Sequence, residues 1–323
     1  MDETFTLPAR DEIPEIFVRR QSQETTPRGT VLYVHGATFP SALSIAYRFD
    51  GRSWMDELVA ASFDCWSFDF AGFGHSGRYP AMNASPAGGE PLGRVPMAAR
   101  QLAEVVDAIL DRTEQPRLSI VAHSWGSLVT GRFASEHPDV IDRLVLFGAI
   151  ARRAEAGDPP SFDAWYPLTT DAQYRRFVED VPQGHLMVLL DRHFARWAPA
   201  YLDTDPTSAE RTPPTVRTPS GPLADIEAAW HGDFPYDPAA VQAPVLIVRG
   251  EWDSLCADVD ARWLFDAFTG SPIRRDVKIG AATHLMHLEE SRYALHREIE
   301  TFLAGHDVST STPQAETTTI QEA

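Results

Sequence analysis

The chain has few cysteines, a single lysine and no long apolar run. Its 323 residues include two cysteines, Cys65 and Cys256, too few for a disulfide framework, so we expect a reducing, cytoplasmic location. Lysine occurs once, at Lys278, and the net charge is −18, which argues against nucleic acid or an anionic membrane as partner. No apolar run approaches the ~20 residues needed to span a bilayer, and Met1 to Glu15 lack the basic start and apolar stretch of a signal peptide.

From Gly29 onward, short apolar runs rich in β-branched residues alternate with longer segments of helical periodicity. This alternation predicts an α/β fold with a mostly parallel central sheet flanked by helices. The expected strands are Thr30–Val34, Cys65–Phe70, Leu118–Ala122, Leu144–Phe147, Val245–Val248 and Val277–Ile279. The expected helices are Ser53–Ser62, Ala98–Asp111, Arg262–Phe268 and Tyr293–Leu303, whose apolar stripes belong to the core.

The alternation stops between residues 151 and 240, where 12 of the 25 prolines fall. Short helical patterns within this range predict an inserted helical cap. They are Tyr174–Val178, Leu186–Trp197 and Ile226–Trp230, and Asp203–Pro222 is expected to be a long irregular loop. We therefore divide the chain into a core of residues 1–150 and 241–306, a cap of residues 151–240 and a disordered tail of residues 307–323.

The sharpest local pattern is the run from Leu118 to Ser127, in which an apolar strand leads through Ala-His-Ser-Trp-Gly into a helix. The run resembles the nucleophile elbow of the α/β-hydrolase fold superfamily, and this resemblance makes Ser124 the nucleophile. In that family a strained turn exposes the serine hydroxyl and directs the helix N-terminus at developing negative charge. Ala122 stands where the commoner motif has glycine.

Two further segments resemble parts of the same family. His35-Gly36-Ala37-Thr38 resembles its oxyanion loop, which implies that the backbone N–H groups of Ala37 and Trp125 form the oxyanion hole, with His35 bracing the loop. The run from Asp69 to Gly77 resembles its D-x-x-G-x-G-x-S segment, which implies a scaffold role for Asp69 and Ser76.

A serine nucleophile needs a base and an acid that orients the base. Gly250-Glu251-Trp252-Asp253 resembles the loop that supplies the acid, and Asp253 rather than Glu251 occupies the motif position. His284 follows the last expected strand and is the base on this match, with His287 as its rival. The order Ser, Asp, His along the chain is that of the α/β-hydrolases.

Recognition of the substrate is expected from aromatic side chains near the motifs and in the cap. The residues expected to bind substrate are Phe39, Trp125, Trp165, Trp197 and Trp230. Arg175 and Arg176 could bind a substrate carboxylate, but their helical pattern beside Glu179 and Asp180 favours a solvated face.

The resemblance implies a serine hydrolase of the esterase or proline iminopeptidase-like branch, cleaving a carboxylic ester of a small to medium apolar substrate through an acyl-enzyme at Ser124. A small-molecule substrate is the only partner this implies, with no cofactor and no metal, and the oligomeric state is left open. An amidase or aminopeptidase, a carbon–carbon bond hydrolase and an acyltransferase could use the same triad. Epoxide and haloalkane chemistry is disfavoured, because those relatives carry aspartate where this chain has Ser124. A catalytically silent binding protein is the alternative outside enzymes.

Overall fold

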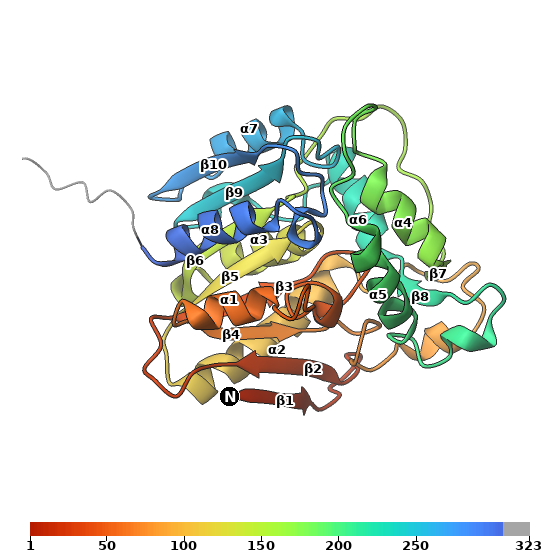
Figure 1. Cartoon of the computed structure of the whole chain (residues 1–323), viewed down its shortest axis with the longest axis horizontal. Coiled ribbons are helices and arrows are strands. Elements are labelled where there is room, and N and C mark those ends of the chain that lie inside the picture. The colour runs from red at the N-terminus through yellow and green to blue at the C-terminus, as the bar shows by residue number, and fades with distance from the viewer. Residues whose placement is uncertain (306–323) are drawn as a thin grey trace, which may run out of the picture.

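An eight-stranded sheet forms the centre of the fold (Figure 1). The computed structural model describes residues 1–305. The strands are β1 (Asp2–Leu7), β2 (Ile16–Gln21), β3 (Thr30–Val34), β4 (Asp64–Phe68), β5 (Leu118–His123), β6 (Ile141–Phe147), β9 (Val245–Gly250) and β10 (Arg274–Ile279). Their order in the sheet is β1-β2-β4-β3-β5-β6-β9-β10, and neighbouring strands from β4 to β10 run parallel.

Helices cover both faces of this sheet, because side chains of the buried strands alternate between two cores. The covering helices are α1 (Trp54–Ala60), α2 (Val95–Thr113), α3 (Gly126–Glu136), α7 (Asp258–Ala267) and α8 (Arg292–Leu303). In β5, Ile120 packs in the core that contains residues of α2, α3 and α7, whereas Val121 packs in the core that contains residues of α1 and α8. Short 3₁₀ helices lie at Ser41–Leu43, Pro80–Asn83, Pro138–Val140, Ser208–Glu210, Pro238–Ala240 and Met286–Leu288.

The α/β fold and the mostly parallel sheet expected from the sequence are confirmed. Strands β1 and β2 were not expected. They pair antiparallel at one edge of the sheet, and β1 alternates only between exposed and half-buried residues, so its apolar signal is weak. Helix α1 begins at the expected serine, since Ser53 Oγ accepts the Asp56 N–H at 3.1 Å and Asp56 accepts the Ser53 N–H at 2.8 Å.

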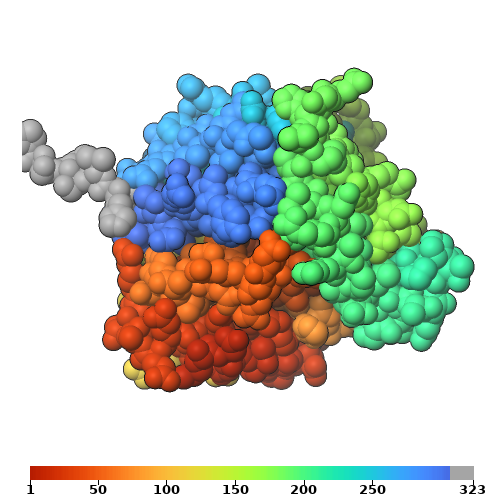
Figure 2. Space-filling view, viewed as in Figure 1, coloured from red at the N-terminus to blue at the C-terminus, as the bar shows by residue number. Residues whose placement is uncertain are grey.

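The segment between β6 and β9 lies at one end of the sheet and packs against the core, as the green and cyan part of Figure 2 shows. We refer to residues 151–240 as the cap segment. Its elements are β7 (Trp165–Leu168), α4 (Thr170–Val178), α5 (Asp191–Leu202), β8 (Val216–Pro219) and α6 (Gly221–Trp230). Strands β7 and β8 pair antiparallel, so the segment is not built from helices alone.

The expectation of an irregular loop at Asp203–Pro222 is wrong in part: the range is irregular up to Thr215 apart from a 3₁₀ turn, but it ends in β8 and the start of α6 and contains an ionic cluster. Asp205 is buried and accepts hydrogen bonds from the guanidinium groups of Arg211 and Arg217 at 2.6 and 3.1 Å. A proline-rich run with one buried carboxylate and two arginines can therefore order itself through charge-assisted hydrogen bonds. The expected tail, residues 307–323, lies outside the described residues.

Candidate active site

Ser124 occupies the sharp turn between β5 and α3 with a left-handed backbone, φ 53°. Such a conformation is strained for a residue other than glycine and persists only where the surroundings hold it. Here the Ser124 N–H donates to the Phe147 carbonyl at 3.1 Å. Glycine is required at 126, because a Cβ there would lie 2.6 Å from the His35 carbonyl oxygen. The turn thus holds the serine side chain above the carboxyl end of β5.

The structure brings Ser124, His284 and Asp253 together from three loops at the same edge of the sheet. His284 Nε2 lies 2.8 Å from Ser124 Oγ, and His284 Nδ1 lies 3.0 and 3.1 Å from the two carboxylate oxygens of Asp253. A carboxylate beside Nδ1 favours the tautomer with its proton on that nitrogen, which leaves Nε2 free to accept the serine proton. All three side chains are buried.

The orientation of Asp253 and His284 is fixed by neighbours that the sequence motifs do not name. Asp253 Oδ1 accepts the N–H groups of Leu255 and Cys256 at 2.9 and 3.0 Å. Gly148, at the end of β6, has φ 56°, and a Cβ there would lie 3.0 Å from the His284 ring. A glycine directly after the strand Ile141–Phe147 was the signal that could have found this position.

A buried carboxyl group, Glu289, holds the loop that carries His284. It accepts the Thr283 N–H at 3.1 Å and also hydrogen-bonds the Thr283 hydroxyl. Burial raises the pKa of Glu289 to about 7, although the hydrogen bonds from Thr283 oppose this shift. The sequence analysis gave Glu289 no role.

The backbone N–H groups of Ala37 and Trp125 have no hydrogen-bond acceptor among residues 1–305. They follow β3 and Ser124 respectively, and Ala37 lines the same cavity as Ser124. Gly36 allows the two loops to approach, since a Cβ at this position would lie 3.1 Å from Ser124 Cβ. Two N–H donors beside a nucleophile are what an oxyanion hole requires.

His35, Asp69 and Ser76 brace these loops, as the sequence predicted. His35 Nε2 accepts the Phe70 N–H at 3.0 Å while Nδ1 donates to the Gly36 carbonyl, and burial lowers the His35 pKa. Asp69 accepts the backbone N–H of Ser41 at 2.8 Å, and Ser76 Oγ accepts the Phe17 N–H at 2.8 Å.

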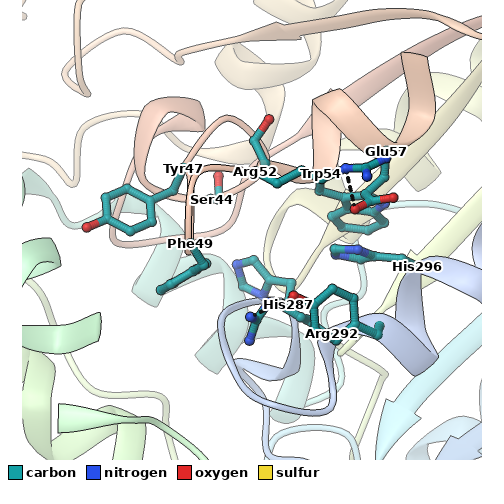
Figure 3. A pocket seen from close by; sticks show the side chains of 11 residues that line it. Ser44, Tyr47, Phe49, Arg52, Trp54, Glu57, His287, Arg292 and His296 are labelled. Carbon is teal, nitrogen blue, oxygen red and sulfur yellow. Dashed lines mark hydrogen bonds and ion pairs between the residues drawn. The ribbon is translucent and has the colours of Figure 1, made fainter. Parts of the chain in front are cut away.

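The rival base, His287, faces a different cavity from Ser124. Neither of its ring nitrogens has a hydrogen-bond partner, and its ring packs against His123 with centroids 4.5 Å apart. Figure 3 shows His287 among Phe49, Arg292 and His296, on the side of a small pocket that also contains Trp54. Burial lowers the pKa of His287 well below its usual value. The ring is therefore neutral, and no hydrogen bond links it to Ser124.

The cavity beside Ser124 measures about 10 Å³, room for roughly one water molecule. It is lined by Gly36, Ala37, Thr38, Phe39, His123, Ser124, Arg176, His284 and Leu285. Phe39 therefore lines the cavity beside Ser124, where the sequence analysis expected it. Arg176 was expected on a solvated face, but it is half-buried and lines the cavity, whereas its neighbour Arg175 is exposed as expected.

The Trp125 indole was expected to line the substrate pocket and does not. Its side chain is 1% exposed and turns away from the cavity, donating its indole N–H to Asp225 of α6 at 3.0 Å. A buried indole N–H needs an acceptor, and Asp225 supplies one from the cap segment. Trp125 thus joins the core to the cap segment.

The three tryptophans expected to bind substrate from the cap segment also lie outside this cavity. Trp197 is buried one layer behind Phe39, with ring centroids 5.3 Å apart. Trp230 lies under the guanidinium of Arg153 at 4.4 Å, and Trp165 is half-buried in the β7–β8 pair. These large aromatic side chains pack within the cap segment and against the core. The sequence pattern alone could not distinguish such packing from contact with substrate.

Among residues 1–305, no group of three or more histidine, cysteine, aspartate or glutamate side chains could hold a metal ion. No helix in this part of the chain is long and apolar enough to cross a membrane.

Known proteins share this architecture at low sequence identity. The thioesterase domain from the curacin biosynthetic pathway matches with a TM-score of 0.62 and 15% identity, over 93% of this chain and 99% of that chain. A monoacylglycerol lipase from Paleococcus ferrophilus matches with a TM-score of 0.56 and 19% identity, over 90% and 99%. Epoxide hydrolase A from Mycobacterium thermoresistibile matches with a TM-score of 0.62 and 13% identity, over 94% and 99%.

These likenesses to solved structures concern the fold alone. A search of curated proteins gives no match. The profile of the family described as alpha/beta hydrolase fold matches residues 29–291, which is most of the chain. The chain therefore belongs to the alpha/beta hydrolase fold family.

Proposed function

We propose that this protein is a serine hydrolase that cleaves a carboxylic ester through an acyl-enzyme at Ser124. The observation that carries the proposal is the hydrogen-bonded chain from Ser124 Oγ through the His284 ring to Asp253, with separations of 2.8 and 3.0 Å. Separations of this size suit proton transfer between a nucleophile and its base.

The first half of the proposed reaction forms the acyl-enzyme. Ser124 Oγ attacks the ester carbonyl carbon while its proton passes to His284 Nε2. The carbonyl oxygen becomes an oxyanion and accepts the N–H groups of Ala37 and Trp125. As the tetrahedral intermediate collapses, the carbon–oxygen bond to the alcohol breaks and the alkoxide takes the proton from His284. Asp253 stabilises the imidazolium that forms in between.

The second half regenerates the enzyme. A water molecule gives its proton to His284 Nε2 and adds to the acyl carbon, and the bond to Ser124 Oγ then breaks as Oγ recovers the proton. The products are one carboxylic acid and one alcohol. Because the cavity holds roughly one water molecule, an ester can bind only if the elements that cover Ser124 move.

The identity of the residue at the turn argues against epoxide hydrolysis, the activity in the name of one similar structure. Epoxide hydrolases of this fold attack with aspartate, and this chain has Ser124.

A cytoplasmic location and a small-molecule substrate stay predictions. Cys65 and Cys256 are both free and buried.

The test is a screen of the purified protein against p-nitrophenyl esters of several chain lengths and aminoacyl p-nitroanilides, together with labelling by a fluorophosphonate probe. We expect labelling at Ser124 and turnover of esters rather than anilides. Preference for anilides would make the protein an amidase. Absence of both labelling and turnover would favour a silent binding protein.

A further inference from the structure

Arg176 is the single residue of the cap segment, among the described residues, that lines the cavity beside Ser124. The other eight lining residues come from the core. Arg176 lies near the end of α4, and the buried residues Gln173 and Phe177 mark the face of this helix that turns toward the core. The side chain closest in sequence, Arg175, is exposed and does not line the cavity.

Among residues 1–305, no carboxylate lies within ion-pair distance of the Arg176 guanidinium, and its buried Nε atom lacks a hydrogen-bond partner. Four other arginines of the cap segment form ion pairs; they are Arg153, Arg192, Arg211 and Arg217. Arg176 differs from the other arginines of the described residues in lining the cavity beside Ser124. Leaving such a charge unpaired is unfavourable unless a ligand supplies the anion.

Neutral polar side chains without partners surround this part of the cap segment. The hydroxyls of Tyr166 and Tyr201 and both polar atoms of the Gln173 side chain are buried and lack hydrogen bonds. Gln173 and Tyr201 are each 0% exposed. Burial raises the pKa of Tyr166 to about 12 although the nearby positive charge of Arg176 opposes this shift, so the hydroxyl keeps its proton. The positive charge of Arg176 acts on both tyrosines, but none of these three side chains lines the cavity beside Ser124, so the Arg176 guanidinium is the group that a ligand in the cavity reaches.

The lining of the cavity includes this guanidinium and no carboxylate, so it suits an oxyacid anion rather than an amine. A planar guanidinium binds a carboxylate through two parallel N–H···O bonds. We propose that Arg176 binds a carboxylate of the substrate, so that the preferred substrates of Ser124 are esters that carry a carboxylate a few bonds from the reacting carbonyl. This inference rests on the proposed ester hydrolysis.

The experiment compares esters that differ in one carboxylate. One pair carries it on the acyl side, monomethyl glutarate against methyl valerate, and a second pair carries it on the alcohol side, acetoxyacetate against propyl acetate. The rate of acid release gives kcat/KM for each ester and the charged-to-neutral ratio for each pair. We expect the wild-type protein to prefer the charged member of at least one pair, with the difference mainly in KM.

In Arg176→Gln the charged-to-neutral ratio of that pair should fall by about 10- to 100-fold, which corresponds to the loss of hydrogen bonds to a charged group. Arg176→Lys keeps the positive charge but not the planar guanidinium, so its charged-to-neutral ratio should lie between those of the wild type and Arg176→Gln. The matched control is Arg175→Gln, which removes an equal charge from the exposed neighbouring position and should leave the ratio unchanged. Thermal melting of each variant shows whether it is folded.

Two results would overturn the inference while leaving the proposed hydrolase intact. One is Ser124-dependent turnover by the wild type without preference for the charged member of either pair. The other is an equal loss on charged and neutral esters in Arg176→Gln, which would mean that Arg176 supports the cap segment or the reacting oxygen. The proposed function fails as well if the folded wild-type protein hydrolyses no ester, or if the Ser124→Ala variant hydrolyses esters as fast as the wild type.

Discussion

Trp125 and Asp225, 100 residues apart, are joined by a hydrogen bond of 3.0 Å from the indole N–H to the carboxylate. Trp125 directly follows Ser124, and Asp225 lies in α6 of the cap segment. The same carboxylate accepts the Val95 N–H at 2.7 Å and the guanidinium of Arg94. The position of the cap segment is thereby coupled to the turn that carries Ser124.

We expect Asp225→Ala to lower the free energy of unfolding by about 3 kcal/mol, because it leaves a buried indole N–H and a buried backbone N–H without acceptors. Urea unfolding at neutral pH measures this. Glu227→Ala, on the same helix, is the control: Glu227 is half-exposed and faces His231 at 3.8 Å, so its loss should cost about 0.5 kcal/mol. Equal effects of the two substitutions would refute the coupling.

Ser124→Ala should abolish labelling by a fluorophosphonate probe and lower kcat by roughly 10⁴-fold or more, with the melting temperature little changed. The matched control is Ser135→Ala. Ser135 lies on α3, and its hydroxyl donates to the Arg132 carbonyl at 2.8 Å, away from the cavity. Undiminished turnover by folded Ser124→Ala would exclude the acyl-enzyme.

Glu289→Gln should change how stability depends on pH. Burial raises the pKa of Glu289 from its usual 4.5 to about 7, so the folded state binds a proton more tightly than the unfolded state does. The resulting stabilisation is complete below about pH 4.5, falls as the pH rises and is lost above about pH 7. Glutamine mimics the protonated acid and does not titrate.

We therefore expect Glu289→Gln to gain stability relative to the wild type between pH 5 and pH 8, by an amount on the order of 2–3 kcal/mol. Urea unfolding of both proteins at several pH values measures the difference. If the two proteins differ by the same amount at every pH from 5 to 8, Glu289 does not titrate in this range and the pKa of about 7 is refuted.

Trp197→Ala tests whether the cap tryptophans touch substrate. Because Trp197 packs behind Phe39 and does not line the cavity, its removal should lower kcat/KM for a short acetyl ester and a bulky ester alike, and should destabilise the protein by about 3–5 kcal/mol. Phe39→Ala is the comparison, since Phe39 lines the cavity and its loss should discriminate between the two esters. A loss confined to the bulky ester in Trp197→Ala would place Trp197 in contact with substrate.

The sequence determined the fold and the loops that meet at the site. Apolar runs mark the buried parallel strands, and the motifs follow β3, β5, β9 and β10 in the chain, so the topology carries their residues to one edge of the sheet. Ser124, Asp253 and His284 could be singled out because each lies in a short motif that a few neighbouring residues are enough to identify.

Tertiary structure decided where the remaining side chains point. Local pattern could not tell that Trp125 bonds Asp225, that Glu289 holds Thr283 in a buried site, or that Arg176 rather than Arg175 lines the cavity. Strands β1 and β2 and the short pair β7–β8 were also not predicted. β1 has no buried residue, and β7 and β8 have four residues each, so their apolar periodicity is weak; β2 is fixed by its pairing with β1 and β4. Burial and pairing between distant segments fix these features, and they depend on packing that no window of neighbouring residues contains.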